Sequence, residues 1–324
     1  MTVLTFVEQE DGTLSGTSRK VLTFARGLAE SSGTALHAAT IGTATDETSK
    51  ALSEQGVATV HQVTHDLLDD YAPEGWAAAV TQLIDDRSPT VVIGPGTARG
   101  GEVLAHVAAR LDLPLATNCT AVRAVTGGWE LTRLRWGGVL LEDARLEATT
   151  ALLTAAPHHT AAEPAAVAGE AEPAWFAPEL TDDLMITRVH DRATSTGGIS
   201  LATAPVVVAG GRGVGSAEGF GQLEELADLL GGAVGCSRVA TNNGWRSHND
   251  QVGQTGTRVA PDLYIALGIS GATQHWVGCM SSKRILAINL DADAPMVTKA
   301  HYAALGDLHE ILPAVLAETR ARRG

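Results

Sequence analysis

The chain has 324 residues, of which 44% are hydrophobic and 4% aromatic, so its length predicts two domains of about 150 residues each, with cores built mainly from aliphatic side chains. The formal net charge of −14 is uneven, because residues 1–200 hold 13 Lys and Arg against 26 Asp and Glu, whereas residues 201–324 hold 10 against 11. The acidic first part repels phosphate backbones and anionic lipids, which excludes nucleic acid as an expected partner, whereas the nearly neutral second part can accept an anionic cofactor.

Short β-branched runs alternate with helical patterns in the first part of the chain. Strands are predicted at residues 3–7, 35–41, 59–63 and 90–94, and helices at residues 18–30, 76–86 and 102–111. This β-α-β rhythm predicts an α/β domain with a mostly parallel sheet. After residue 113 the pattern changes, and residues 129–136 and 149–155 are predicted as strands without intervening helices.

A change of composition marks the end of the first domain. Residues 157–178 read PHHTAAEPAAVAGEAEPAWFAP, which is rich in Ala, Glu and Pro and has no sustained apolar period. We expect a linker or a segment that lies on a partner. A small, polar stretch at residues 194–203 is the second boundary signal. The expected domains are therefore residues 1–190 and residues 201–324.

The second domain again alternates strands and helices. Strands are predicted at residues 206–209, 233–236, 263–267 and 285–289, and helices at residues 220–230 and 308–320. We expect a parallel sheet of the Rossmann or flavodoxin type.

A glycine-rich loop, GGRGVGSAEGF, follows the first strand of the second domain. Glycines let the backbone approach a ligand, and the start of the next helix offers N–H groups to phosphate. The spacing misses G-x-G-x-x-G because Ser216 takes the sixth position, and no acidic residue about 20 positions later sits at a strand end to bind a ribose. The loop is interpreted either as a phosphate site, which is favoured, or as a tight turn. It argues against an ordinary nicotinamide site.

Two polar loops bracket one apolar strand in the stretch NDQVGQTGTRVAPDLYIALGISGATQHWVG. Gln254 and Thr255 precede the strand, and Ser270, Gln274 and His275 follow it. Such loops bring donors together at the carboxyl edge of a sheet, where open α/β folds bind ligands. A flavin ring needs such donors at N5 and at its pyrimidine oxygens.

These motifs carry a family resemblance. In order along the chain, GGRG, SR at residues 237–238, QVGQTG, LYIALGISGATQH, SSK, AIN, DAP and GDL resemble the flavin domain of the electron transfer flavoprotein alpha subunit. The resemblance covers nearly all of residues 206–315. The first part is similar to the same family through its VLTFVEQEDGTLS opening and its β-α order.

The resemblance implies an FAD site and roles for the residues that match its motifs. Arg212 would lie by the pyrophosphate and Arg238 against the isoalloxazine face, with Thr255 near N5 and His275 near the C2 oxygen. The implied FAD-binding set is Arg212, Ser237, Arg238, Val252, Gly253, Gln254, Thr255, Ser270, Gly271, Ala272, Thr273, Gln274, His275, Asn289, Asp307 and Leu308, the last three at the adenosine end.

The resemblance also implies a redox carrier without its own substrate turnover. It would pair with a beta subunit that carries AMP, accept electrons from a flavin dehydrogenase and deliver them to a quinone-linked or other acceptor. The chain departs from the family at Trp136-Gly137-Gly138 and at His158-His159, which bears on the choice of partner. A nicotinamide-dependent oxidoreductase and a non-redox nucleotide-binding protein are the alternatives, and the broken glycine motif counts against the first.

Other patterns predict no further chemistry. The three cysteines, Cys119, Cys236 and Cys279, are far apart and lack the spacing of a zinc or redox pair. His61 and His65 lack a zinc signature and are expected to be solvated. Neither a signal peptide nor a membrane-spanning run is expected. We expect a cytoplasmic protein that does not insert into a membrane.

Overall fold

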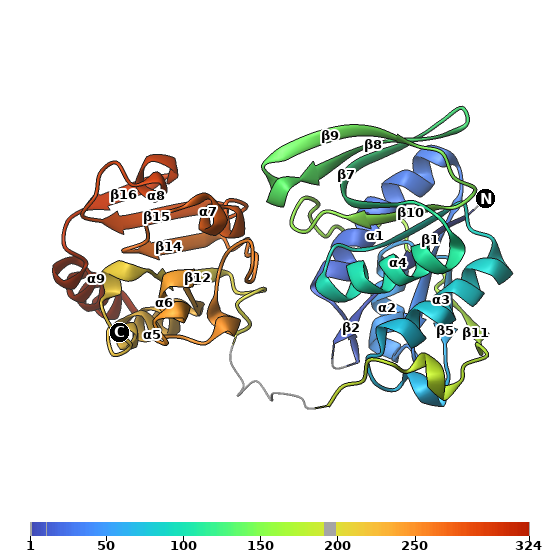
Figure 1. Cartoon of the computed structure of the whole chain (residues 1–324), viewed down its shortest axis with the longest axis horizontal. Helices are drawn as coiled ribbons and strands as arrows, with labels where there is room; N and C mark the ends of the chain where they lie inside the picture. Colours follow the sequence, from blue (N-terminus) through green and yellow to red (C-terminus); the bar gives the residue numbers. More distant parts are fainter. Residues whose placement is uncertain (1, 11, 191–198, 324) are drawn as a thin grey trace. The chain divides into compact units, whose positions relative to one another are not determined.

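The structure is a computed structural model that describes residues 2–10, 12–190 and 199–323. The chain divides into two compact units, Met1–Ala193 and Thr194–Gly324, called here the N-terminal and C-terminal domains. Each is an α/β unit with its own sheet and core (Figure 1). The predicted α/β fold with mostly parallel sheets is therefore confirmed. Within the described ranges, no helix has the length and apolar content needed to cross a membrane.

A nine-stranded sheet forms the centre of the N-terminal domain. Its order is β11 (Glu172–Phe176), β5 (Thr59–Val63), β4 (Ala35–Ile41), β1 (Thr2–Phe6), β6 (Val91–Pro95), β10 (Ala151–Ala155), β7 (Leu115–Val125), β8 (Gly128–Arg135) and β9 (Leu140–Leu146). Pairing is parallel from β11 to β7 and antiparallel from β7 to β9. A hairpin of β2 (Gln9–Glu10) and β3 (Thr13–Leu14) follows β1.

Helices cover both faces of this sheet, because neighbouring residues of a strand point to opposite sides. Val3 belongs to the core under one pair of helices and Leu4 to the core under the other. The first pair is α1 (Gly16–Ser32) and α2 (Asp46–Glu54), and the second is α3 (Pro73–Arg87) and α4 (Ala98–Leu111). The last two helices begin earlier than predicted, because the first-turn proline of α3 and the Thr97 cap of α4 precede the apolar period.

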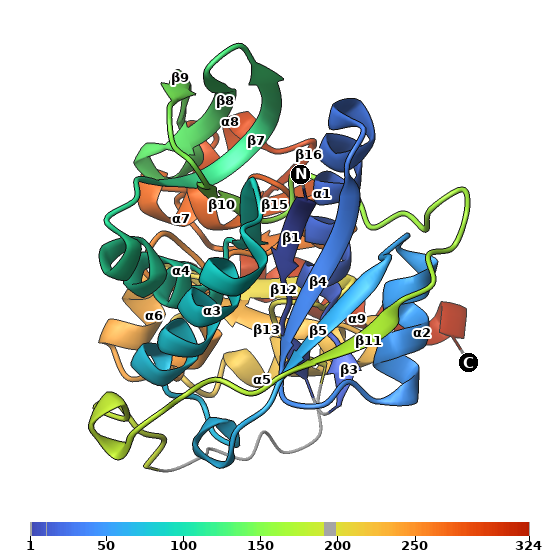
Figure 2. The same ribbon diagram turned by 90° about the vertical axis from the view of Figure 1, so that its right-hand side faces the viewer.

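The segment at residues 157–178 packs against its own domain. β11 pairs in parallel with β5 at the edge of the sheet, and the two strands lie side by side in Figure 2. The backbone N–H of Gly169 donates to the Ser53 carbonyl, and Arg26 donates to the Glu163 carbonyl at 2.8 Å. A linker interpretation is therefore wrong for residues 172–176. Backbone hydrogen bonds can hold a strand at the edge of a sheet even where its sequence has no regular spacing of apolar residues.

A five-stranded parallel sheet forms the centre of the C-terminal domain. Its order is β13 (Ala233–Cys236), β12 (Val206–Gly210), β14 (Leu263–Leu267), β15 (Arg284–Asn289) and β16 (Tyr302–Leu305). This is the flavodoxin-like order, in which the chain moves to one side of β12 and then to the other. The switch point, where ligands bind in such folds, is therefore the carboxyl edge between β12 and β14.

Helices again lie on both faces of the C-terminal sheet. α5 (Phe220–Leu230) and α9 (Leu308–Arg323) pack on one side, and α7 (Thr273–Cys279) and α8 (Pro295–Lys299) on the other. A short helix, α6 (Arg238–Asn242), follows β13 directly. Several of these helices begin at the carboxyl edge of the sheet, so their first turns border the switch point.

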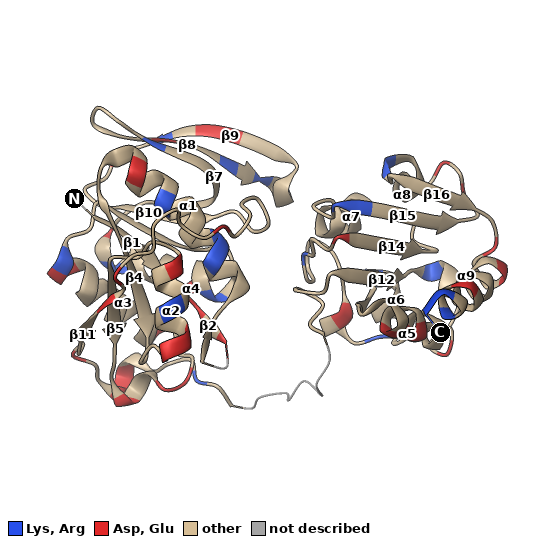
Figure 3. Ribbon diagram, turned by 180° about the vertical axis from the view of Figure 1, so that it is seen from behind, with Lys and Arg blue, Asp and Glu red and all other residues tan. Residues whose placement is uncertain are grey.

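The excess of acidic side chains belongs to the N-terminal domain, as the sequence count requires. Figure 3 shows Asp and Glu spread over its helices, loops and strands rather than gathered on one element. Several are engaged locally, as in the ion pair of Glu142 with Arg133 at 2.5 Å. Most of the acidic side chains are therefore distributed over the surface of the domain.

Candidate functional site

A pocket of about 580 Å³ lies at the carboxyl edge of the C-terminal sheet. It is formed by the loops that follow β12, β13, β14 and β15. Its lining residues are Arg212, Gly213, Ser237, Arg238, Val239, Gly268, Ile269, Ser270, Gly271, Ala272, Gln274, His275, Asn289, Asp291 and Ala294. The pocket therefore occupies the switch point that the strand order defines.

Two glycine loops meet at the floor of this pocket. A Cβ atom on Gly213 would lie 2.7 Å from the Gly268 Cα atom, and one on Gly268 would lie 2.6 Å from the Gly213 Cα atom. The Gly213 N–H donates to the Gly268 carbonyl at 3.1 Å, and Gly268 has φ of 61°, which favours glycine. Only glycines allow the loops to approach so closely. The close contact between Gly213 and Gly268 therefore forms although the loop lacks the G-x-G-x-x-G spacing.

Ser237 and Arg238 follow β13 at the pocket wall. The Ser237 backbone N–H donates to the Gly210 carbonyl at 2.9 Å, which ties the two strand ends together. Its side chain is buried, and Oγ has no hydrogen-bond partner in the described part of the chain. Arg238 is exposed, and no ion pair joins it to another described residue. An unpaired buried hydroxyl and an unpaired cation are suited to an anionic ligand.

The loop at residues 251–255 is held by a buried amide. Gln251 accepts from the Thr241 hydroxyl at 3.0 Å and donates to Thr255 Oγ1 at 3.0 Å. The Gln254 backbone N–H donates to the Gln274 carbonyl at 2.7 Å, which joins this loop to the first turn of α7. Gln254 and Thr255 therefore neighbour the pocket loops, although they do not line the pocket itself.

His275 lines the pocket from the first turn of α7 and is 7% exposed. Its Nε2 atom lies 2.8 Å from the hydroxyl oxygen of Tyr264 on β14. Burial lowers the pKa of His275 to about 4, and the Val252 backbone opposes this shift, although the geometry at Nδ1 falls short of a hydrogen bond. We therefore regard Nδ1 as unpaired within the described residues. At neutral pH the ring is uncharged.

The pocket brings together most of the residues predicted from the sequence. Those that line it are Arg212, Ser237, Arg238, Ser270, Gly271, Ala272, Gln274, His275 and Asn289, and those that do not are Val252, Gly253, Gln254, Thr255, Thr273, Asp307 and Leu308. Asp307 accepts from the His309 N–H at 2.8 Å at the start of α9. Leu308 is buried in the core. Both have structural partners in their own helix and core.

Sequence reasoning missed six lining residues, which are Gly213, Val239, Gly268, Ile269, Asp291 and Ala294. Gly213, Val239, Gly268 and Ile269 directly follow a strand end or adjoin a predicted residue, whereas Asp291 and Ala294 lie in the loop after β15. Gly268 had a usable signal, because a glycine at the end of a buried strand often marks a close backbone approach. Asp291 carries a carboxylate, which accepts from the Asp293 N–H at 2.9 Å, and the remaining four residues line the pocket through their position alone.

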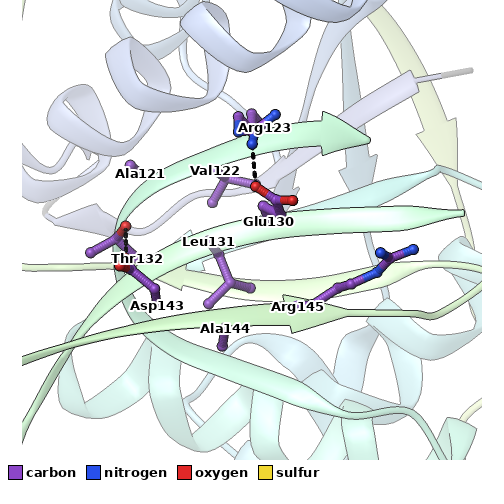
Figure 4. Close-up of a pocket in the computed structure, with 9 residues that line it drawn as sticks. All are labelled: Ala121, Val122, Arg123, Glu130, Leu131, Thr132, Asp143, Ala144 and Arg145. Carbon is purple, nitrogen blue, oxygen red and sulfur yellow. Dashed lines mark hydrogen bonds and ion pairs between the residues drawn. The ribbon is translucent and has the colours of Figure 1, made fainter. Parts of the chain in front are cut away.

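The N-terminal domain has a hollow of about 550 Å³ on its antiparallel strands (Figure 4). Arg123 forms an ion pair with Glu130 on the next strand, and Thr132 donates to Asp143 at 2.7 Å. These pairs satisfy the polar groups across the strands, as on a solvated sheet face. The hollow therefore presents few unpaired groups to a ligand.

His61 is buried, contrary to the expectation that it is solvated. It is 4% exposed on β5, and its Nε2 atom lies 3.1 Å from Nδ1 of His37 on β4. Burial and the neighbouring His37 lower the pKa of His61 to about 4. Among the described residues, no group of three or more His, Cys, Asp or Glu is placed to hold a metal ion.

Two family models match the chain. Residues 200–280 match the electron transfer flavoprotein FAD-binding domain, and residues 3–179 match the electron transfer flavoprotein domain. The chain belongs to the electron transfer flavoprotein family. The family resemblance and the FAD cofactor predicted from the sequence are both confirmed.

Curated relatives cover almost the whole chain. It is 37% identical over 322 residues to the electron transfer flavoprotein subunit alpha of Mycobacterium tuberculosis, covering 99% of each chain. Over 324 residues it is 34% identical to the alpha subunit of Thermoanaerobacterium thermosaccharolyticum, covering 97% of this chain and 96% of that one. Protein FixB of Bradyrhizobium diazoefficiens is 36% identical over 332 residues, covering 99% of this chain and 89% of that one. These matches give no support to the nicotinamide or non-redox alternatives.

The residues at the C-terminal pocket fit FAD. Ser237 Oγ and His275 Nδ1 are buried polar atoms without partners in the described part of the chain, and a dinucleotide offers partners to both. The close contact of Gly213 and Gly268 keeps the floor of the pocket free of side chains. The residues that fit FAD therefore lie at the switch point, on the carboxyl edge of the C-terminal sheet.

Proposed function

We propose that this chain is the alpha subunit of a heterodimeric electron transfer flavoprotein and that the C-terminal pocket holds its FAD. The observation that carries the site assignment is the pair of unpartnered buried polar atoms, Ser237 Oγ and His275 Nδ1, on residues that line a pocket at the switch point. FAD supplies the electron-transfer chemistry when bound, whereas the protein supplies position and electrostatics.

The chain's own residues divide the work of binding. The Gly213 and Gly268 loops and Arg212 receive the pyrophosphate, because close backbone and one cation suit a doubly charged group. Arg238 presents its charge to the isoalloxazine ring. His275 is uncharged at neutral pH because burial lowers its pKa, so it contributes a hydrogen bond and no net charge. Ser270 and Gln274, which also line the pocket, add polar contacts to the dinucleotide.

The proposed partners follow from the alpha-subunit assignment. A beta subunit that carries AMP completes the carrier, a flavin dehydrogenase donates electrons, and a quinone-linked or other acceptor receives them. Trp136, at one of the departures from the family pattern, is 82% exposed at the turn between β8 and β9, which leaves it available to a partner. The three cysteines are free and buried, which suits the proposed cytoplasmic location.

Cofactor extraction tests the function. The chain is co-expressed with its cognate beta subunit, and the released flavin is identified by chromatography and quantified per alpha chain. We expect one FAD per alpha chain. FMN, a nicotinamide or no nucleotide at full occupancy would contradict the proposed function.

A matched pair of glycine variants tests the location of the site. In Gly213→Ala the added methyl group meets the Gly268 backbone, whereas in Gly221→Ala, on α5, it meets nothing within 4 Å. The first variant should lose FAD. The second should keep FAD and gain about 0.5–1 kcal/mol of stability, because alanine is the better helix former. Equal FAD content in the two variants would show that the contact between Gly213 and Gly268 is not part of the FAD site.

A further inference from the structure

Tyr264 is a fully buried polar residue behind the pocket. It is the second residue of β14, is 0% exposed, and packs in the core that includes Val207, Val252 and Cys279. Its hydroxyl has one hydrogen-bond partner in the described part of the chain, the Nε2 atom of His275 at 2.8 Å. A buried phenol almost always finds a partner, so this contact is the reason that a tyrosine is tolerated there.

The direction of this hydrogen bond follows from the partners that are available. A neutral imidazole has one N–H donor and one acceptor nitrogen, and a phenol has one proton to donate. If Nε2 carried the proton, the Tyr264 proton would be buried without an acceptor, which costs about 1–3 kcal/mol. If Tyr264 donates to Nε2, the phenol proton and Nε2 are both satisfied, and the imidazole proton lies on Nδ1, which has no hydrogen-bond partner within the described residues. Burial keeps the phenol protonated, because it raises the pKa of Tyr264 well above 10.0.

We propose that Tyr264 is a positioning residue for the FAD site, which donates to Nε2 of His275 and thereby fixes the imidazole proton on Nδ1. His275 then offers the cofactor a hydrogen-bond donor rather than an acceptor. Nδ1 is buried and forms no hydrogen bond within the described residues, although the Val252 backbone interacts with the ring and raises its pKa. Because His275 lines the pocket, in this proposal a ligand oxygen accepts the Nδ1 proton. The choice of tautomer by a hydrogen bond on the far side of the ring is general for histidines that serve a site. The proposal rests on the proposed function, because FAD supplies that oxygen.

The first test measures the tautomer directly. The full-length chain, in the assembly in which it is purified and labelled at its histidine nitrogens, is studied by NMR with and without FAD. We expect the proton of His275 on Nδ1 in both states, and a change toward Nε2 in Tyr264→Phe. Tyr302→Phe is the matched control, because Tyr302 is 61% exposed on β16 of the same domain. A proton on Nε2 in the unmodified chain overturns the proposal, even where the variant does not fold.

The second test asks whether Tyr264 acts through His275. FAD dissociation constants are measured for the unmodified protein, Tyr264→Phe, His275→Gln and the double variant. Loss of one neutral hydrogen bond should raise the constant about twofold to twelvefold in Tyr264→Phe. The same change should add nothing in the His275→Gln background. An equal loss in both backgrounds would make Tyr264 a merely structural residue.

The two tests separate this proposal from the function on which it rests. The NMR measurement needs no cofactor, so it reports on Tyr264 even if the pocket binds no FAD. If the chain binds FAD fully and His275 carries its proton on Nε2, the proposed function stands and the proposed role of Tyr264 is wrong. An Nδ1 proton in a chain that binds no FAD would keep the hydrogen bond but overturn the claim that it serves a cofactor.

Discussion

Acidification should destabilise the C-terminal domain through His275. Burial lowers the pKa of this histidine from 6.5 to about 4, so the unfolded chain takes up a proton before the folded domain does. The stabilising contribution is therefore complete above pH 6.5 and is lost as the pH falls toward 4. The difference of about 2.5 pH units corresponds to about 3 kcal/mol of unfolding free energy at about 1.4 kcal/mol per unit. This is a large share of the stability of an ordinary domain.

The assay must isolate one domain and one histidine. Fluorine-labelled tryptophans at Trp245 and Trp276 report on the C-terminal domain alone, and urea unfolding is followed by NMR from pH 7 to pH 4. Carboxylates titrate in the same range, so the informative quantity is the difference between variants. His275→Gln should remove about 3 kcal/mol of the acid-induced loss, whereas His248→Gln, at an exposed position, should not. Parallel stability curves for the unmodified chain and His275→Gln would refute the reasoning.

Three further predictions concern single side chains. Ser237→Ala should raise the stability of the FAD-free protein by about 1–3 kcal/mol, because Oγ is buried there without a partner, and should weaken FAD binding by about 0.5–1.5 kcal/mol in equilibrium titration. Arg238→Ala should lower the flavin reduction potential by tens of millivolts, on the order of 1 kcal/mol of lost attraction to reduced anionic flavin, in potentiometric titration; an unchanged potential would remove Arg238 from the ring. His61→Gln should flatten the loss of N-terminal stability between pH 6.5 and 4, because burial and His37 lower the pKa of His61 to about 4, and urea unfolding followed at Trp76 measures it.

Most of the inner parallel strands of both sheets could be predicted from the sequence, whereas β7, β11 and β16, which also pair in parallel, were not predicted. Strands buried on both faces read as short apolar runs, such as VVVA within β12, and the helices between them carry the helical period. β9 was not predicted, because its LLEDARL sequence alternates around a partly solvated sheet face and contains three charged residues. β11 was not predicted, because Pro173 and a polar context are typical of a loop, although both are tolerated at a sheet edge.

The candidate site could be predicted where it depends on residues next to strand ends. Ser237 follows β13 directly, Ser270 lies in the loop after β14, and His275 lies in the first turn of the helix after that loop. Parallel strands bring their carboxyl ends to one edge. The contact of Gly213 with Gly268 could not be predicted, since it depends on loop conformations separated by more than fifty residues. The same is true of the Tyr264 hydrogen bond, because periodicity assigns Tyr264 to the core and says nothing of what its hydroxyl meets.

The N-terminal domain has a similar edge but a different chemistry. A pocket of about 990 Å³ lies at the carboxyl ends of β1, β4 and β5, and three of its lining residues, Glu10, Asp66 and Asp69, are carboxylates. Some of its other polar groups have protein partners, as His65 Nδ1 accepts from the Leu67 N–H at 3.1 Å, whereas Gln9 Oε1 is a buried acceptor without a partner in the described part of the chain. Trp76 Nε1 likewise donates to the Asp70 carbonyl at 3.0 Å, and the Tyr71 hydroxyl to Glu102 at 2.6 Å.

Negative charge makes this second pocket unsuitable for a phosphate, and the Trp76 and Tyr71 donors are already engaged. Three carboxylates repel an anionic group, and Arg99 is the only lining Lys or Arg among the described residues. We therefore expect that the chain binds one nucleotide and not two, although both domains share the parallel α/β architecture. Equilibrium dialysis of the FAD-loaded chain against radiolabelled FAD and AMP measures this, with Gly213→Ala as the variant that should bind neither. Binding of a second nucleotide per alpha chain would contradict this expectation. It would show that a large pocket at the edge of a parallel sheet is sufficient for nucleotide binding, whatever its acidic side chains and already hydrogen-bonded donors.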